Sequence, residues 1–189
     1  MINESIVIQH LTKYFGTHTV LNNFSATLSL DGVTVLRGVS GAGKTTLFRL
    51  LLKLETPDEG TITGMEQRKP AVVFQEDRLL PWASALENVS LVSDKTRAEQ
   101  ALSRLGLCDN LRQLPRELSG GMKRRVAIAR ALAYQGDILL LDEPFTGLDE
   151  ENKQIAAGAL LDVQAPIIVI THDDAEAELF GVYQTLFVD

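Results

Sequence analysis

The sequence predicts an α/β fold in which a mostly parallel sheet is covered by helices, with antiparallel strands at its edge and an inserted helical lobe. Short, continuous apolar segments of strand length alternate with segments that repeat apolar residues at helical spacing. Continuous apolar strands are typical of parallel sheets with both faces buried. Residues 84–135 carry only helical patterns, which predicts the inserted lobe.

Length and composition indicate one globular domain. Of the 189 residues, 45% are hydrophobic and 23% are charged, which is ordinary for a chain with a hydrophobic core. The net charge of −7 argues against a nucleic-acid-binding protein. Cys108 is the single cysteine and favours a reducing compartment. Neither a secretory signal nor a membrane-spanning apolar run is recognised, so we expect a chain that is cytosolic or bound to a membrane only through a partner.

The alternation of apolar and polar residues in the N-terminal region predicts strands with one covered face. Apolar and polar residues alternate over residues 5–9 and 24–30. Residues 11–16 are expected to form a turn carrying two adjacent aromatic residues, which either stack on a purine or pack against the sheet. Asp31–Gly32 predicts a tight hairpin turn into the next strand.

Residues Gly38–Thr46 fit the phosphate-binding pattern G-x-x-x-x-G-K-[ST]. Their glycines allow the backbone to curl close to a polyphosphate with its N–H groups pointing inward. The loop lies between an apolar strand, 33–36, and a helical pattern, 45–54, whose positive N-terminus also favours phosphate. Lys44 can reach the β- and γ-phosphates, and the Thr45 hydroxyl can ligate Mg²⁺. The expected nucleotide-binding residues here are Gly38, Val39, Ser40, Gly41, Ala42, Gly43, Lys44, Thr45 and Thr46.

Two short strands follow at residues 61–63 and 71–74, and Gln75 comes at the end of the second. Ligands bind at the carboxyl ends of strands in such sheets, but a lone glutamine is usually an ordinary surface residue. Trp82 is the only tryptophan, and it is expected either in the core or as a hydrophobic contact for a partner.

The helical stretch contains a second group of glycines, in Leu118–Met122, at the start of its last helix. Such glycines form an N–H nest at a positive helix end, with Ser119 as a capping hydroxyl, although spacing alone favours a plain helix cap. The basic residues Lys123–Arg125 are expected to form a solvated helix face, because three charges are too few for a nucleic-acid site.

The apolar strand 138–141 ends in two carboxylates, Asp142 and Glu143. Asp142 fits a residue that holds Mg²⁺, and Glu143 could act as general base for a water molecule. A later apolar strand, 167–170, ends near His172, although a lone histidine is more often structural. Helices at 150–161 and 174–180 and a last strand at 183–188 complete the pattern. The residues alone therefore predict a Mg²⁺-dependent nucleotide phosphohydrolase.

The order of these motifs resembles the nucleotide-binding subunit of ATP-binding cassette (ABC) transporters over essentially the whole chain. Leu118–Met122 is similar to the family's signature motif, and Phe74–Glu76 to its Q-loop. Thr146–Asp149 resembles the D-loop, and Thr171–Asp173 the switch loop.

The resemblance implies a single ABC ATPase domain over residues 1–189. Its RecA-like P-loop NTPase core would comprise about 1–75 and 136–189, and its helical lobe about 76–135. ATP and Mg²⁺ are the implied cofactors. Two copies would close head to tail over two ATP molecules and drive a transmembrane permease, with a solute-binding protein in the complete system. The chain would then be cytoplasmic and held on the inner face of the membrane by the permease, without nucleic acid.

The resemblance also implies residue roles. Phe15 falls at the position whose aromatic ring stacks on adenine. Gln75 is implied as a Mg²⁺ ligand and sensor of the permease, and His172 as a γ-phosphate contact that holds water and Glu143 in place. The signature residues of one subunit would cap the γ-phosphate bound to the other. The implied catalytic residues are Glu143, His172, Gln75 and Lys44; the metal ligands are Thr45, Gln75 and Asp142; the signature contacts are Ser119, Gly120 and Gly121.

Residues Val73–Trp82 are most similar to importers of the nitrate, sulfonate, taurine and thiamine-precursor group. An exporter subunit, a soluble cassette ATPase and a non-hydrolysing clamp are the alternatives. A coiled-coil insertion and a basic arm, expected for the second, are not recognised, and the presence of Glu143 and His172 argues against the third. The chain departs from the family at Lys123–Arg124, where arginine-glutamine is commoner, and at Gly147, where alanine is usual.

Overall fold

The computed structural model describes residues 5–188. Within that range no helix is long and apolar enough to cross a membrane. The strands are β1 (Ser5–Phe15), β2 (His18–Ser29), β3 (Val33–Arg37), β4 (Glu59–Thr63), β5 (Pro70–Val73), β6 (Ile138–Asp142), β7 (Ile167–Ile170) and β8 (Gln184–Phe187). The helices are α1 (Lys44–Leu51), α2 (Ala85–Ser90), α3 (Lys95–Arg104), α4 (Gly120–Tyr134), α5 (Glu150–Leu161) and α6 (Asp174–Leu179), with 3₁₀ turns at Cys108–Asn110 and Pro115–Glu117.

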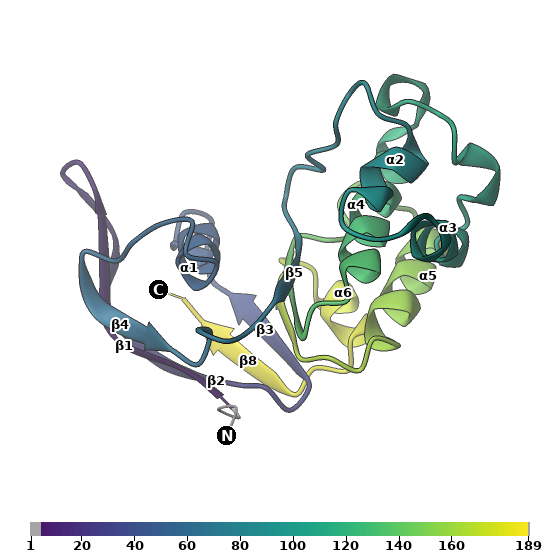
Figure 1. Ribbon diagram of the computed structural model, residues 1–189. Coiled ribbons are helices and arrows are strands. Elements are labelled where there is room, and N and C mark those ends of the chain that lie inside the picture. The colour runs from purple at the N-terminus through teal and green to yellow at the C-terminus, as the bar shows by residue number, and fades with distance from the viewer. Residues whose placement is uncertain (1–4, 189) are drawn as a thin grey trace.

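The strands form two sheets (Figure 1). A five-stranded sheet has the order β5-β6-β7-β3-β8, and its neighbouring strands pair in parallel. A three-stranded antiparallel sheet has the order β2-β1-β4. The predicted α/β fold class is confirmed, and the antiparallel strands form a sheet of their own.

Both faces of the parallel sheet are buried, which explains its continuous apolar strands. In β6, Leu139 and Leu141 point into a core shared with α4 and α5, whereas Ile138 and Leu140 point into a second core. The second core contains residues of α1 and of the antiparallel sheet, such as Phe48, so α1 packs between the two sheets (Figure 1). The loop before α1 is thereby fixed from both sides.

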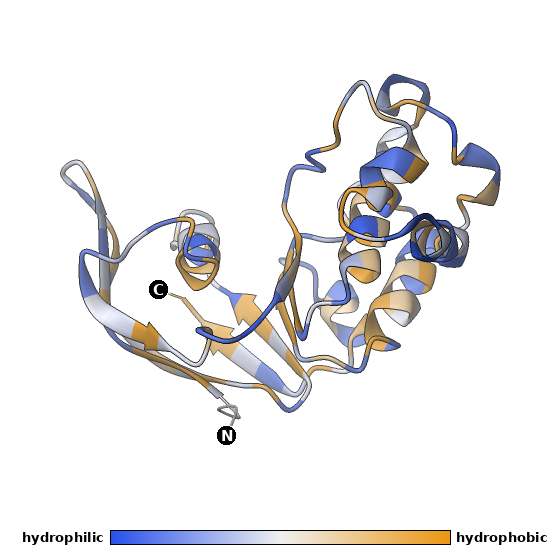
Figure 2. Ribbon diagram, in the orientation of Figure 1, coloured by the Kyte–Doolittle hydropathy of each residue, from blue (hydrophilic) through white to orange (hydrophobic). Residues whose placement is uncertain are grey.

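Helices α2, α3 and α4 lie between β5 and β6 in the chain and pack against one another. Buried residues on each of them, including Val89, Leu102 and Ile128, belong to the same core as the α5 side of the parallel sheet. In Figure 2 helix α3 is mostly hydrophilic, whereas α4 and α5 are hydrophobic along much of their length. Helix α4 is therefore the element that joins the inserted helices to the sheet.

Two predictions for the N-terminal region are wrong. The expected turn at 11–16 is strand up to Phe15, and the chain turns at Gly16, which has a φ of 62°. The β1–β2 register shifts in three places, which disturbs the alternation that marks a strand. Asp31–Gly32 does not close a hairpin, because β2 pairs with β1 whereas β3 pairs with β7 and β8.

Two further expectations are settled by local geometry. The helix predicted at 45–54 ends at Leu51, and Lys53 then adopts a left-handed φ of 55°, which a continuing helix cannot accommodate. Trp82 is 73% exposed, so its placement in the core is wrong. Its loop is held by the fully buried Asn88, whose side-chain amide donates to three backbone carbonyls.

Candidate active site

The loop between β3 and α1 curls tightly at the carboxyl end of the parallel sheet. Gly38, Gly41 and Gly43 have positive φ angles of 151°, 85° and 94°. A Cβ atom at Gly43 would lie 2.9 Å from the Leu21 side chain, and one at Gly38 would collide with the backbone carbonyl oxygen of Val188. Close packing and backbone conformation both require glycine at positions 38 and 43, whereas Gly41 is required by its backbone conformation alone.

The side chain of Lys44 is folded back over this loop. Its Nζ atom donates to the carbonyl oxygens of Gly38, at 2.8 Å, and Val39, at 2.9 Å. Lys44 is only 6% exposed. An ammonium group has three N–H donors, so two bonds to the loop leave one for a ligand. The loop therefore presents a positive charge close to the start of α1.

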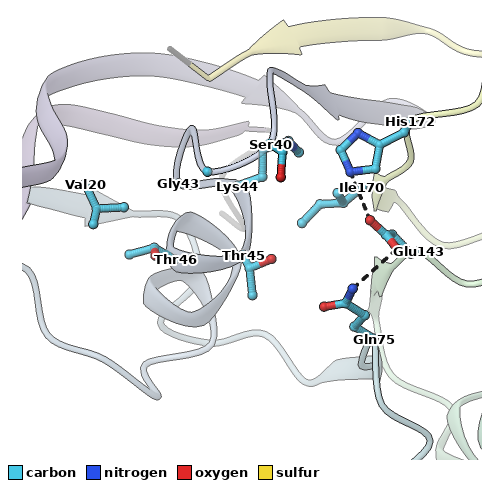
Figure 3. Close-up of a pocket in the computed structure, with 11 residues that line it drawn as sticks. Val20, Ser40, Gly43, Lys44, Thr45, Thr46, Gln75, Glu143, Ile170 and His172 are labelled. Carbon is cyan, nitrogen blue, oxygen red and sulfur yellow. Dashed lines mark hydrogen bonds and ion pairs between the residues drawn. The ribbon is translucent and has the colours of Figure 1, made fainter. Parts of the chain in front are cut away.

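A pocket forms where this loop faces the ends of three parallel strands (Figure 3). Gln75 follows β5, Glu143 follows β6 and His172 follows β7. The structure thus brings together residues that are far apart in the sequence. The residues that line the pocket are Val20, Ser40, Gly41, Gly43, Lys44, Thr45, Thr46, Gln75, Glu143, Ile170 and His172.

Glu143 lies between the other two polar residues of this edge (Figure 3). Its Oε1 atom is 2.9 Å from Nε2 of His172, and its Oε2 atom accepts a long hydrogen bond of 3.5 Å from Nε2 of Gln75. The backbone of Glu143 is left-handed, with a φ of 47°. This arrangement holds a carboxylate at the pocket wall opposite the loop.

Asp142 and Thr45 meet beside this pocket. The Thr45 hydroxyl donates to Asp142 Oδ2 at 3.4 Å. A second pocket adjoins the first, since Thr45 and Gln75 line both, and Asp142 lines the second. Burial raises the pKa of Asp142, and the neighbouring Glu143 carboxylate adds to the effect, whereas the Thr45 hydrogen bond opposes it. A hydroxyl, a carboxylate and an amide oxygen are hard donors of the kind that Mg²⁺ prefers, so these residues fit that ion.

Phe15 does not line the pocket. It ends β1, opposite His18 of β2, and is 48% exposed. The Lys13 ammonium lies 5.4 Å from the centre of its ring. Val20, on the same hairpin, does line the pocket. The hairpin that reaches the pocket thus also carries an exposed aromatic ring, and the neighbouring Tyr14 is 41% exposed.

The glycines at the start of α4 do not line the pocket either. Ser119 caps the helix by accepting a 3.2 Å hydrogen bond from the backbone N–H of Met122. Gly120 is exposed, and a Cβ atom built on it would meet no described atom within 4 Å. A Cβ atom on Gly121 would lie 3.1 Å from the Gly147 carbonyl oxygen. The nest therefore lies against the loop after β6, away from the pocket of its own chain.

The prediction that Lys123–Arg125 form a solvated helix face is wrong for Arg124. This residue is 2% exposed, and its guanidinium donates to backbone carbonyls that follow β5 and β6. Arg125 is also engaged, at 2.8 Å from the Leu105 carbonyl oxygen. Apolar residues three, four and seven positions after Arg124 are all buried. That spacing was the available signal that Arg124 lies on the inner face of the helix.

Comparisons with known proteins agree with this geometry. The sequence pattern of the ABC transporter family matches residues 21–146. Two relatives, both named aliphatic sulfonates import ATP-binding protein, come from Paraburkholderia xenovorans and Zymomonas mobilis. The first is 39% identical over 92% of this chain and 72% of its own length. The second is 41% identical over 92% of this chain and 78% of its own length.

A solved dimeric structure of MJ0796, a bacterial ABC transporter cassette, has the same fold. It superposes with a TM-score of 0.85 at 28% identity, over 97% of this chain and 94% of that one. The same cassette is also known in a dimeric post-hydrolysis state bound to ADP and Pi.

Proposed function

Because this chain belongs to the ABC transporter family, we propose that it is the ATP-hydrolysing subunit of a solute importer. One observation carries the proposal: the loop of Lys44 faces Gln75, Glu143 and His172 across a single pocket. A polyphosphate bound to the loop would extend toward a carboxylate that is already held by two polar neighbours. That is the geometry that hydrolysis of a terminal phosphate needs.

In this proposal ATP binds with its phosphates along residues 38–46 and its adenine against Phe15. The inward N–H groups and the N-terminus of α1 stabilise the phosphate charge, and Lys44 adds a full positive charge. Thr45, Asp142 and Gln75 would hold Mg²⁺, which neutralises charge on the β- and γ-phosphates when bound.

Glu143 then acts as the general base. It accepts a proton from a water molecule as the water oxygen attacks the γ-phosphorus in line with the leaving ADP oxygen. His172 orients the carboxylate through Oε1 and contacts the γ-phosphate, and Gln75 approaches Oε2. The chain contributes positioning and charge, which are the main sources of rate acceleration in phosphoryl transfer.

The site is completed by a second copy of the chain. Ser119, Gly120 and Gly121 of one protomer would donate backbone N–H groups to the γ-phosphate held by its partner. The exposed nest, which lies away from its own pocket, supports this arrangement. The MJ0796 cassette to which the chain is similar is dimeric. ATP would favour the closed dimer because it contacts both protomers only in that state.

A membrane permease is the proposed recipient of this motion, with a solute-binding protein delivering the solute. We place the chain at the inner face of the membrane, attached through the permease. The names of the two relatives support an aliphatic sulfonate or a similar small anion as the solute. The whole chain would act as one domain, with a RecA-like core at about 1–75 and 136–189 and a helical lobe at about 76–135.

Phosphate release from MgATP by the purified chain tests the catalytic part of this proposal. The wild type is expected to turn over ATP, and Glu143→Gln to lose about 10²- to 10⁴-fold in rate while still binding nucleotide. Lys44→Ala is expected to lose binding itself. A Glu143→Gln variant that hydrolyses ATP at the wild-type rate would contradict the assignment of the base.

Transport direction is tested on the complex of the chain with its permease. In an importer, adding the loaded solute-binding protein is expected to raise ATP hydrolysis. A complex that ignores the binding protein and extrudes solute from the cytoplasmic side would instead be an exporter.

A further inference from the structure

We propose that Arg124 is a positioning residue that fixes Glu143 and Gln75 relative to each other by binding the backbone of both. The inference rests on the proposed function, because the role of Arg124 is exerted through those two residues.

The first half of the contact is with the turn that carries Glu143. The Arg124 guanidinium donates to the carbonyl oxygens of Asp142, at 2.9 Å, and Glu143, at 2.6 Å, through Nη2. Its Nε atom donates to the Pro144 carbonyl oxygen at 2.8 Å. Three successive carbonyls converge on one side chain because Glu143 has a left-handed backbone, with a φ of 47°. Such a conformation is strained for a residue other than glycine and persists only where its surroundings enforce it.

The second half of the contact is with the segment after β5. Nη1 of Arg124 donates to the carbonyl oxygens of Phe74, at 2.6 Å, and Gln75, at 3.2 Å. It also pairs with Asp77 Oδ1 at 3.2 Å. Strands β5 and β6 are neighbours in the sheet, so one guanidinium bridges the ends of two adjacent strands. The side chains of the two bridged residues also meet, in the long Gln75–Glu143 contact of 3.5 Å.

The chemistry of the guanidinium explains why arginine can hold both segments. It offers five N–H donors in a planar fork and no acceptor, and all of its described partners here are oxygen atoms. A glutamine offers two N–H donors and an oxygen, which would face carbonyl oxygens and find no donor there. A lysine would keep the positive charge but lacks the planar set of five N–H donors. Burial of this charge at 2% exposure is consistent with its complete set of acceptors.

Steady-state kinetics of Arg124→Gln and Arg124→Lys test the proposal. We expect kcat to fall about 10- to 100-fold in both, because the carboxylate and the amide lose their fixed positions. KM for ATP should stay within about threefold of wild type, because Lys44 and the phosphate loop make no described contact with Arg124. A residue that only stabilised the fold would lower the melting temperature and leave kcat per folded molecule unchanged, and that result would overturn the proposal.

Arg125→Gln is the matched control. It removes the same charge from the next position of α4, but its side chain faces the Leu105 carbonyl oxygen. Its kcat and KM are expected to match the wild-type values. If Arg125→Gln lost as much kcat as Arg124→Gln, the loss would come from α4 as a whole and the proposal would fail.

The double variant Arg124→Gln/Glu143→Gln tests whether Arg124 acts through Glu143. If it does, Arg124→Gln will lower the residual rate of Glu143→Gln by clearly less than the factor by which it lowers the wild-type rate, because only the part exerted through Gln75 remains. A full 10- to 100-fold further loss would show an independent role and overturn the proposal.

Backbone amide exchange gives a readout that does not depend on hydrolysis. In Arg124→Gln, exchange should accelerate in residues 74–77 and 142–146 and remain unchanged in 38–46. Unchanged exchange in the first two segments would refute the bridge. A wild-type chain that released no phosphate would refute the proposed function, and the exchange data would still decide whether Arg124 holds the two segments.

Discussion

The phosphate loop and the catalytic edge that faces it are built in different ways. The loop is one continuous stretch, Gly38–Thr46, held by its own backbone, by the Lys44 ammonium and by packing against β2. The catalytic edge combines single residues that follow β5, β6 and β7, joined by side-chain contacts and by Arg124. Damage to the loop should therefore abolish nucleotide binding, whereas damage to the edge should slow chemistry and spare binding.

After Glu143→Gln, His172→Ala is expected to have the largest effect that separates the two regions. It removes the 2.9 Å contact with Glu143 and the proposed γ-phosphate contact, so kcat should fall about 10²- to 10³-fold. Nucleotide affinity should change by less than about threefold, because the loop is intact. Phosphate release and titration with a fluorescent ATP analogue measure the two quantities. Equal losses in both would mean that the regions are not separable.

Gly43→Ala damages the phosphate loop and leaves the residues of the catalytic edge unchanged. Its Cβ atom would lie 2.9 Å from Leu21 and 3.0 Å from the Val20 carbonyl oxygen, at a φ of 94° that alanine disfavours. We expect nucleotide affinity to fall at least 10-fold and the free energy of unfolding to fall by about 1–3 kcal/mol. Equilibrium titration and urea unfolding measure these changes. A variant with wild-type affinity would show that the loop can bind nucleotide in a different backbone conformation.

Phe15→Ala tests the β1–β2 hairpin, which reaches the pocket through Val20. If the ring stacks on adenine, affinity for ATP should fall about 5- to 10-fold, while affinity for inorganic triphosphate stays the same. The comparison of the two ligands by calorimetry isolates the base from the phosphates. Tyr14→Ala is the control, since this aromatic neighbour is similarly exposed. A stronger effect in Tyr14→Ala would assign the adenine contact to that residue instead.

Asp58→Asn is expected to have the smallest effect, and one that depends on pH. The backbone N–H of Tyr14 donates to Asp58 at 2.7 Å and, together with Lys13, lowers the pKa of its carboxyl. A lowered pKa in the folded state means that the stabilisation is present at neutral pH, above the unfolded pKa of about 3.9. It is lost as pH falls through the folded value. Urea unfolding of wild type and variant should therefore differ at pH 7, and the difference should shrink as the pH falls below the unfolded pKa of about 3.9.

Elements with one regular apolar pattern were predictable from the sequence. Strand β7 spans the predicted residues, 167–170, and helix α5 spans the predicted residues, 150–161. Their patterns depend only on which residues are buried and on the spacing at which apolar residues recur, and both can be read from a short segment of the sequence. The hairpin of β1 and β2 was predicted less well, because a half-exposed antiparallel pair with register shifts does not keep a regular alternation.

The candidate site was predictable to the extent that it is local. The phosphate loop follows from a continuous motif, and the strand ends at Gln75, Asp142 and Glu143 follow from apolar runs that stop at polar residues. Arg124 could not be recognised in this way, because its partners are backbone carbonyls 18 to 50 residues distant in the chain. The apolar spacing after Arg124 indicates only that it faces inward, and Asp77 is its one described side-chain partner, so its other partners cannot be identified from residue types.

The split site formed by the phosphate loop of one protomer and the Ser119–Gly121 nest of its partner is the central claim. The measurement that tests it most directly is the molar mass of Glu143→Gln in solution, by light scattering, with and without MgATP. The variant should shift from the monomer mass to twice that mass only when MgATP is present, and Lys44→Ala/Glu143→Gln should remain a monomer. A Glu143→Gln variant that binds ATP and stays at the monomer mass would contradict the claim.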